Sequence, residues 1–206
     1  MTKRPYRSRT RAEAADETRR RITVAAAVVL RAKGAGGFSL ESVAREAGVA
    51  RLTVYNQFGS RRALLEAVFD DRAASGGLHR LREAMTRSDP RAALSELVEI
   101  FCGFWSSDQA SLGSLHAATS GDAEFETALR ERNERRRKAI AVLIGRLASQ
   151  GAVAKKATRD LTDLLFVLTS FQTYAELAAG RTADAACALI WRAVEDAVER
   201  AARAVD

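Results

Sequence analysis

Residues 38–65 contain two short amphipathic segments on either side of one glycine, in the run FSLESVAREAGVARLTVYNQFGSRRALL. Ser39 can cap a first helix, in which apolar residues recur at helical spacing. Gly48 follows the last of them, and glycine readily takes the left-handed conformation that ends a helix. A second helix over 51–58 can turn two apolar residues back onto the first. This segment therefore predicts a helix-turn-helix, which is the strongest constraint on the fold.

The outward face of the second helix offers charge, hydroxyl and amide groups, a combination that suits a DNA groove. Arg51 can make a bidentate match to guanine and Gln57 to adenine, while Thr53 can meet a thymine methyl. We therefore expect these three side chains to contact base edges.

Residues 49–65, which read VARLTVYNQFGSRRALL, resemble the tetracycline-repressor (TetR) family pattern V-S-x-x-T-x-Y-x-x-F-x-S-K-x-x-L. Two positions depart from that pattern. Ala50 replaces the usual Ser and removes a hydroxyl that can cap the second helix or touch phosphate. Arg61 replaces the usual Lys and keeps the charge. The resemblance, with its own motifs, covers roughly residues 18–70. The matching positions are Val49, Thr53, Tyr55, Phe58, Ser60 and Leu64.

The resemblance implies a DNA-binding transcriptional regulator. The usual member of the family is a repressor that binds a palindromic operator as a homodimer. Side chains at matching positions would hold DNA phosphates. For Tyr55 the alternative is packing of its ring on the first helix of the motif. The expected phosphate contacts are Ser39, Tyr55, Asn56 and Arg61.

Positive charge is concentrated at the helix-turn-helix end of the chain. Residues 1–62 contain 14 Lys and Arg against 5 Asp and Glu, a net charge of +9, whereas residues 63–206 have a net charge of −2. This uneven distribution favours a polyanion partner over a generally basic protein. Residues 1–15 form a basic stretch without an apolar face, and we expect a flexible arm there. It could follow the DNA backbone or serve only as a solubilising tail.

The composition indicates an all-α protein, because the chain has two prolines and no sustained strand-like alternation. We expect an N-terminal three-helix DNA-binding head over residues 16–62. A connecting helix that begins after Ser60 would join it to a helical ligand-binding and dimerisation domain over residues 63–206. The connecting helix could either stop near Ala74 or only kink at the glycines that follow it.

The second domain carries further helix signals. Asp89 followed by Pro90 is a strong start signal. Other helices are expected near residues 112–116 and over 122–150, 158–179 and 182–204. The helix over 122–150 has an unusually charged first half, and its spacing favours a solvated, salt-bridged face over a second DNA site. The basic residues of that face are Arg130, Arg132, Arg135, Arg136, Arg137 and Lys138.

The last two predicted helices would form an apolar hairpin. The helix over 158–179 is apolar nearly all round, so it needs packing partners on more than one side. Packing the hairpin against a second copy would give a four-helix interface, as the resemblance also implies; a monomeric core of the same helices is the alternative. The candidate dimer residues are Leu161, Leu165, Leu168, Leu189, Ile190, Ala193, Val194 and Ala197.

The resemblance further implies a small-molecule effector pocket in the second domain. The side chains available to line it are mostly aromatic with few polar anchors, which favours a mostly apolar effector. Such residues at helical spacing are also typical of plain core packing. The candidate residues are Phe101, Phe104, Trp105, His116, Phe166, Phe171 and Tyr174.

Catalytic and metal-binding signals are weak. The two histidines, His79 and His116, lack metal-ligand spacing, and no phosphate loop or nucleophile elbow occurs. We therefore expect a regulator that needs no cofactor and has no enzymatic activity. The alternatives are a helical interaction protein and a small helical enzyme. Cys102 and Cys187 are too few for a disulfide framework and indicate buried thiols. With no signal peptide or apolar run long enough for a bilayer, the expected location is cytoplasmic.

Overall fold

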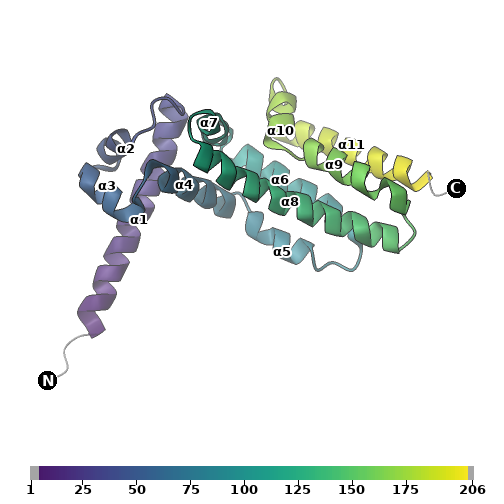
Figure 1. Ribbon diagram of the computed structural model, residues 1–206, viewed down its shortest axis with the longest axis horizontal. Helices are drawn as coiled ribbons and strands as arrows, with labels where there is room; N and C mark the ends of the chain where they lie inside the picture. The colour runs from purple at the N-terminus through teal and green to yellow at the C-terminus, as the bar shows by residue number, and fades with distance from the viewer. Residues whose placement is uncertain (1–4, 204–206) are drawn as a thin grey trace. The chain divides into compact units, whose positions relative to one another are not determined.

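Helices form the ordered elements of this chain in the computed structural model, which describes residues 5–203 (Figure 1). Within that range the structure contains no β-strand, as the composition predicts. The chain divides into two compact units. The first comprises the described residues up to Asp71 together with Ala110–Glu126. The second comprises Arg72–Gln109 and the described residues from Thr127 onward. In residues 5–203, no helix combines the length and the apolar character that a membrane span requires.

The first unit begins with α1 (Pro5–Lys33), which starts well before residue 16, where the DNA-binding head is predicted to begin. Proline is tolerated in the first turn of a helix, and the next glycine is Gly34, so nothing in between interrupts it. Much of the stretch predicted to be a flexible arm is therefore helical, and residues 1–4 of that stretch lie outside the described residues. Whether the stretch meets DNA stays a prediction.

The helix-turn-helix consists of α2 (Leu40–Ala47) and α3 (Arg51–Phe58), with α1 packed against α2. The Ser39 hydroxyl accepts a hydrogen bond from the Ser42 amide at 3.0 Å, and the Ser42 hydroxyl accepts one from the Ser39 amide at 2.9 Å. Gly48 ends α2 in the left-handed conformation, with φ 63°. Both ends of α2 are thus fixed by local chemistry that the sequence predicts.

The connecting helix is α4 (Arg61–Ser75), which begins where the Ser60 hydroxyl accepts a hydrogen bond from the Ala63 amide. It stops rather than kinks. A Cβ on Gly76 would lie 2.8 Å from the Phe104 ring and 2.9 Å from the Phe104 Cα, so only glycine fits there. The chain continues through η1 (Leu78–Arg80) and α5 (Leu81–Ala84). The division between the two units falls within α4.

The remaining helices follow the predicted order. Asp89 caps α6 (Pro90–Ser107) by accepting a hydrogen bond from the Arg91 amide at 2.9 Å. In the first unit, α7 (Gln109–Ala118) is tied to α1, because Ser111 and Ser114 donate hydrogen bonds to carbonyls of that helix. The other elements are η2 (Thr119–Gly121), α8 (Ala123–Ser149), η3 (Lys155–Ala157), α9 (Thr158–Leu168), α10 (Phe171–Ala178) and α11 (Ala183–Arg203).

The predicted single helix over 158–179 is wrong, because the chain breaks it into α9 and α10 at Thr169 and Ser170. The Ser170 hydroxyl caps α10 by accepting a hydrogen bond from the Thr173 amide at 3.1 Å. The Thr169 carbonyl accepts hydrogen bonds from the Trp105 indole and from Arg136, so tertiary donors satisfy the end of α9. In the second unit, α11 packs against α6, α9 and α10.

Candidate nucleic-acid interface

The second helix of the motif, α3, has a mostly polar outward face and a buried apolar side. Val54 and Phe58 are buried, whereas Arg51 and Asn56 are exposed. Tyr55 is 54% exposed, so its ring does not pack into the core. The predicted base contacts Thr53 and Gln57 are partly exposed. The structure therefore brings all five predicted DNA-contact residues of α3 onto one short helix with access to solvent.

Sequence reasoning missed Leu52, which is 66% exposed on α3. A large aliphatic side chain is costly to leave in water, and in this position it lies between Arg51 and Thr53. The signal that could have found it is its place on the face opposite Val54. An apolar side chain on a groove-facing helix can contact a thymine methyl.

The start of α3 lacks the side-chain cap that the start of α2 has. Ala50 occupies the cap position and makes no side-chain hydrogen bond. The first amides of α3 therefore have no side-chain acceptor from the cap residue, and a DNA phosphate could supply one. Ser39, by contrast, uses its hydroxyl in the capping box of α2 while remaining exposed.

Arg61 has a structural role that the sequence did not reveal. Its Nε and Nη2 donate hydrogen bonds of 3.2 Å to the carbonyls of Phe38 and Ala35, and its Nη1 lies 3.6 Å from the Asp122 carboxylate. The guanidinium thus closes the turn between α1 and α2. Three of its nitrogens therefore face acceptors in the protein, while the phosphate contact of Arg61 stays a prediction.

Arg19 fixes α1 against the end of α3. Its guanidinium donates a hydrogen bond to the Gln57 carbonyl and lies 4.2 Å from the centroid of the Phe58 ring. Arginine can combine these two contacts because its head group is planar and carries several donors. This side chain therefore sets the orientation of the helix that carries the candidate base contacts.

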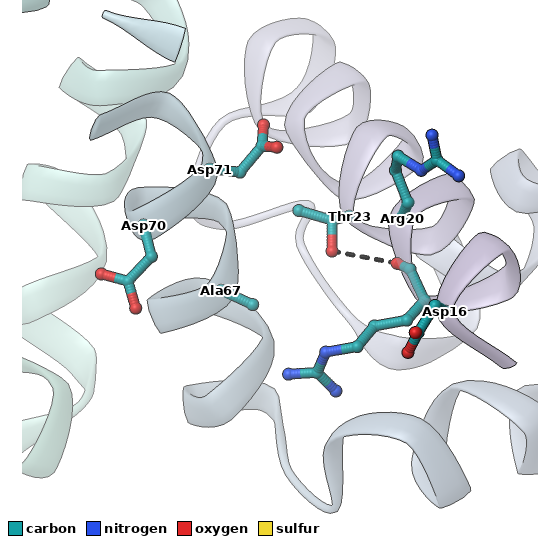
Figure 2. Close-up of a pocket in the computed structure, with 7 residues that line it drawn as sticks. Asp16, Arg20, Thr23, Ala67, Asp70 and Asp71 are labelled. Carbon is teal, nitrogen blue, oxygen red and sulfur yellow. Dashed lines mark hydrogen bonds between the residues drawn. The ribbon is translucent and has the colours of Figure 1, made fainter. Parts of the chain in front are cut away.

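A groove of about 330 Å³ lies between α1 and α4 in the first unit (Figure 2). Three carboxylates and two arginines line it, with Thr23 and Ala67. Thr23 donates a hydrogen bond of 3.0 Å to the Arg19 carbonyl. Figure 2 shows the carboxylates of Asp70 and Asp71 pointing in different directions, as expected for neighbours on a helix. This geometry does not pair them for acid–base chemistry.

In the second unit, three of the candidate effector residues form an aromatic cluster around a fourth, Trp105. Its ring centroid lies 6.0 Å from Phe101, 4.4 Å from Phe104 and 5.6 Å from Phe171. All four rings are buried, and the Trp105 indole donates a hydrogen bond of 3.0 Å to the Thr169 carbonyl.

Tyr174 is also buried in this unit, and burial raises the pKa of its hydroxyl. His116 belongs to the first unit, where its Nδ1 lies 2.8 Å from the Leu112 carbonyl.

Arg136 departs from the predicted solvated face of α8, because its side chain is buried, with 4% of the residue exposed. Its Nη1 donates a hydrogen bond to the Thr169 carbonyl, and its guanidinium lies over the rings of Phe166 and Phe101. Burial, with a smaller contribution from the neighbouring Arg137, lowers its pKa to about 10. Arg137 itself follows the prediction, since it pairs with Glu134 and Asp163 near the surface.

Comparison with known proteins identifies one segment of the chain. Residues 22–68 match the model of a family described as bacterial regulatory proteins, tetR family. This segment, which contains the helix-turn-helix, belongs to the TetR family. The TetR match covers α2 and α3, together with the C-terminal part of α1 from residue 22 and the first half of α4 up to residue 68. No significant relative was found among curated protein sequences.

Solved structures show that the TetR fold extends over most of the chain. A TetR transcription regulator from Haloarcula marismortui has a TM-score of 0.73 at 15% identity, over 90% of this chain and 98% of that one. A TetR-like transcriptional regulator from Rhodococcus sp. RHA1 has a TM-score of 0.67 at 20% identity, over 84% and 91%. A protein from Saccharomonospora viridis, solved in complex with choline, has a TM-score of 0.71 at 19% identity, over 89% and 96%.

The candidate dimer residues divide into two groups by their exposure. Leu168, Leu189 and Ala193 are partly exposed. Leu164 and Val167, outside the predicted set, are 42% and 58% exposed on α9. The residues already buried within the protomer are Leu161, Leu165, Ile190, Val194 and Ala197. Helical periodicity does not separate buried from exposed positions when both faces of a helix are apolar, so the predicted set contains both kinds.

Two further features bear on the chemistry of this chain. In residues 5–203, no three His, Cys, Asp or Glu side chains cluster in a way that could hold a metal ion. Cys102 is buried and Cys187 partly buried, both as free thiols. Burial raises the pKa of the Cys102 thiol well above its usual range, and Cys187 contributes to the shift.

Proposed function

We propose that this TetR-family regulator is a repressor that binds a palindromic operator as a homodimer and is released by a small ligand held in its second unit. The observation that carries the proposal is the exposure of polar side chains on α3. Val54 and Phe58 of the same helix are buried, and the neighbouring helix α2 is capped at both ends. The net charge of +9 in residues 1–62 supports a DNA partner.

At the operator, we assign Arg51, Thr53 and Gln57 to base edges. The exposure of these side chains, in contrast to Val54, is compatible with entry of α3 into the major groove. Tyr55 and Asn56, together with Ser39, are assigned to phosphates. Arg61 is omitted from this set because it is engaged with Ala35 and Phe38.

The homodimer is proposed to form through the exposed side of α9 and α11. Leu164 and Val167 supply exposed apolar surface on α9, which packs against α11 within the protomer. Leu189 and Ala193 of α11 remain partly exposed and can extend that surface. Two such helix pairs would form a four-helix interface, and a symmetric pair of heads fits half-sites roughly 34–36 Å apart.

The ligand is proposed to bind beside the aromatic cluster of the second unit. Its effect on DNA requires different affinities for two states of the dimer that differ in the spacing of the heads. The connecting helix α4 supports this coupling, because it begins in the first unit and ends in the second.

Selection of bound sequences from a random DNA pool tests the proposal. The full-length protein should enrich one short palindrome and prefer it over random duplex by a factor on the order of 10³ or more at matched salt. Sedimentation of the complex should give two protomers per site. Salt-dependent binding without a preferred sequence would instead indicate a helical protein with incidental affinity for nucleic acid.

A further inference from the structure

Arg136 is a buried cation without an anion. Among residues 5–203, no carboxylate lies within ion-pair distance of it, and its Nε has no hydrogen-bond partner. The charge that acts most on it is another cation, Arg137. A buried charge is costly unless it is paired and hydrogen-bonded, so the fold carries an electrostatic cost at this position.

The contacts that Arg136 does make offset only part of that cost. The Thr169 carbonyl lies at the C-terminal end of α9, where the helix dipole favours a cation. Phe166 lies 4.4 Å and Phe101 5.6 Å from the guanidinium carbon, which adds cation–π attraction. A carbonyl and two rings do not neutralise a full charge, and Nε still lacks an acceptor.

The surroundings of Arg136 combine this charge with an apolar site close to solvent. Phe166 is half-buried, and its ring centroid lies 4.4 Å from the Arg136 guanidinium carbon and 4.0 Å from that of Arg137. Arg136 is therefore covered in part by a ring that is itself accessible to solvent. Phe101 and Trp105 lie deeper, with 6.0 Å between their ring centroids. An apolar body with one anionic end matches this arrangement.

We propose that the effector is an amphipathic carboxylate, whose carboxylate binds the Arg136 guanidinium and whose apolar body lies among Phe101, Trp105 and Phe166. This inference rests on the proposed function, since it assigns a ligand class to the effector site. A carboxylate accepts two parallel hydrogen bonds from a guanidinium, including one from the unpaired Nε. It would also compete with the Thr169 carbonyl for Arg136 and so loosen the break between α9 and α10.

The first test measures ligand binding to the full-length protein. Trp191→Phe leaves Trp105 as the single tryptophan, so its fluorescence reports on the site. Decanoate and cinnamate are each titrated against the amide of the same skeleton. At least one acid should bind about tenfold or more tightly than its amide, because a charge-assisted pair replaces a neutral contact. The decanoate and cinnamate arms distinguish an aliphatic from an aromatic source of the carboxylate.

Substitutions localise that preference. Arg136→Met keeps much of the apolar volume and should reduce the acid-to-amide affinity ratio to near one. Arg135→Met removes the same charge from an exposed neighbour on α8 and should leave the ratio unchanged. Arg136→Lys, which keeps the charge but not the paired donors, should give an intermediate ratio and serves if the Met variant does not fold. An unchanged ratio in both Arg136 variants would overturn the proposal.

Stability without ligand provides an independent readout. Arg136→Met should raise the urea midpoint, because it removes an unpaired buried charge and fills the space with apolar atoms. A purely structural cap of α9 predicts the reverse. A lower midpoint together with an unchanged acid-to-amide ratio would identify such a cap and sink the inference.

The inference and the proposed function fail in different ways. If the wild-type protein selects a palindrome but no acid binds more tightly than its amide, the carboxylate site is overturned and the regulator stands. If acids are preferred through Arg136 but no palindrome is selected, the anion site is supported and the proposed operator function falls.

Discussion

At the scale of single residues, two arginines of the first unit do different things, and their surroundings decide which. Arg51 is exposed on α3, whereas Arg61 is held by the carbonyls of Ala35 and Phe38. From the sequence pattern alone, each of these arginines is expected to place a positive charge near DNA. Only the positions of protein acceptors separate a candidate base contact from a structural tie.

Arg51→Ala should relax the operator preference at one base position while leaving other positions unchanged. The expected cost is about 1–3 kcal/mol for the preferred base, because a bidentate pair is lost. Binding to a panel of singly substituted operators measures this. Arg159→Ala, an exposed charge change on α9, is the matched control and should not alter the preference. A uniform loss across the panel would make Arg51 a phosphate contact.

Arg61→Lys restores the usual TetR-family residue and should nevertheless destabilise this chain. Lysine cannot reach both carbonyls with a fork of donors, so about 1–2 kcal/mol of unfolding free energy should be lost. Arg62→Lys is the control, because the surface pairs of Arg62 with Glu66 and Glu124 contribute little. Urea unfolding compares the two. Equal stability of both variants would rule out a structural role for Arg61.

At the scale of elements, close packing between the end of α4 and α6 requires the glycine at position 76. Gly76→Ala places a Cβ within 3 Å of the Phe104 backbone and ring, so the unfolding free energy should fall by about 1–3 kcal/mol. Gly103→Ala is the matched control in α6, where an added Cβ meets nothing within 4 Å. It should gain about 0.5–1 kcal/mol through helix propensity. Thermal unfolding of both variants checks the difference in sign.

Element boundaries were predictable where their cause is local. Ser39, Gly48 and the Asp89–Pro90 pair mark helix ends in the sequence and do so in the structure. The break at Thr169 was not predictable, because its carbonyl is satisfied by Trp105, which is far away in the sequence. Local signals cannot show a tertiary donor.

The candidate sites divide in the same way. The outward face of α3 follows from helical periodicity around Val54 and Phe58, so its polar residues could be chosen from sequence. The burial of Arg136 could not be predicted from sequence, because the alternating charges around it are typical of a solvated helix face. Whether such a residue is buried depends on which helices pack over it, and here Phe166 of α9 and Phe101 of α6 do so.

At the scale of the whole molecule, the proposed dimer depends on exposed apolar side chains. Val167→Glu should shift sedimentation from dimer to monomer and weaken operator binding, because it places a charge in an apolar interface. Val142→Glu on α8 is the matched control, since Val142 has a similar exposure of 52%. A dimer that survives the first change, or dissociates equally in both, would point to another interface.

Arg61 also links segments that are far apart in the chain: the turn before α2, the start of α4, and Asp122 before α8. All of them belong to the first unit, so one side chain outside the α3 surface joins three segments of that unit. A variant that weakens these contacts should therefore lose the folded first unit at a lower temperature than the wild type, which makes Arg61 a natural place for a temperature-sensitive substitution.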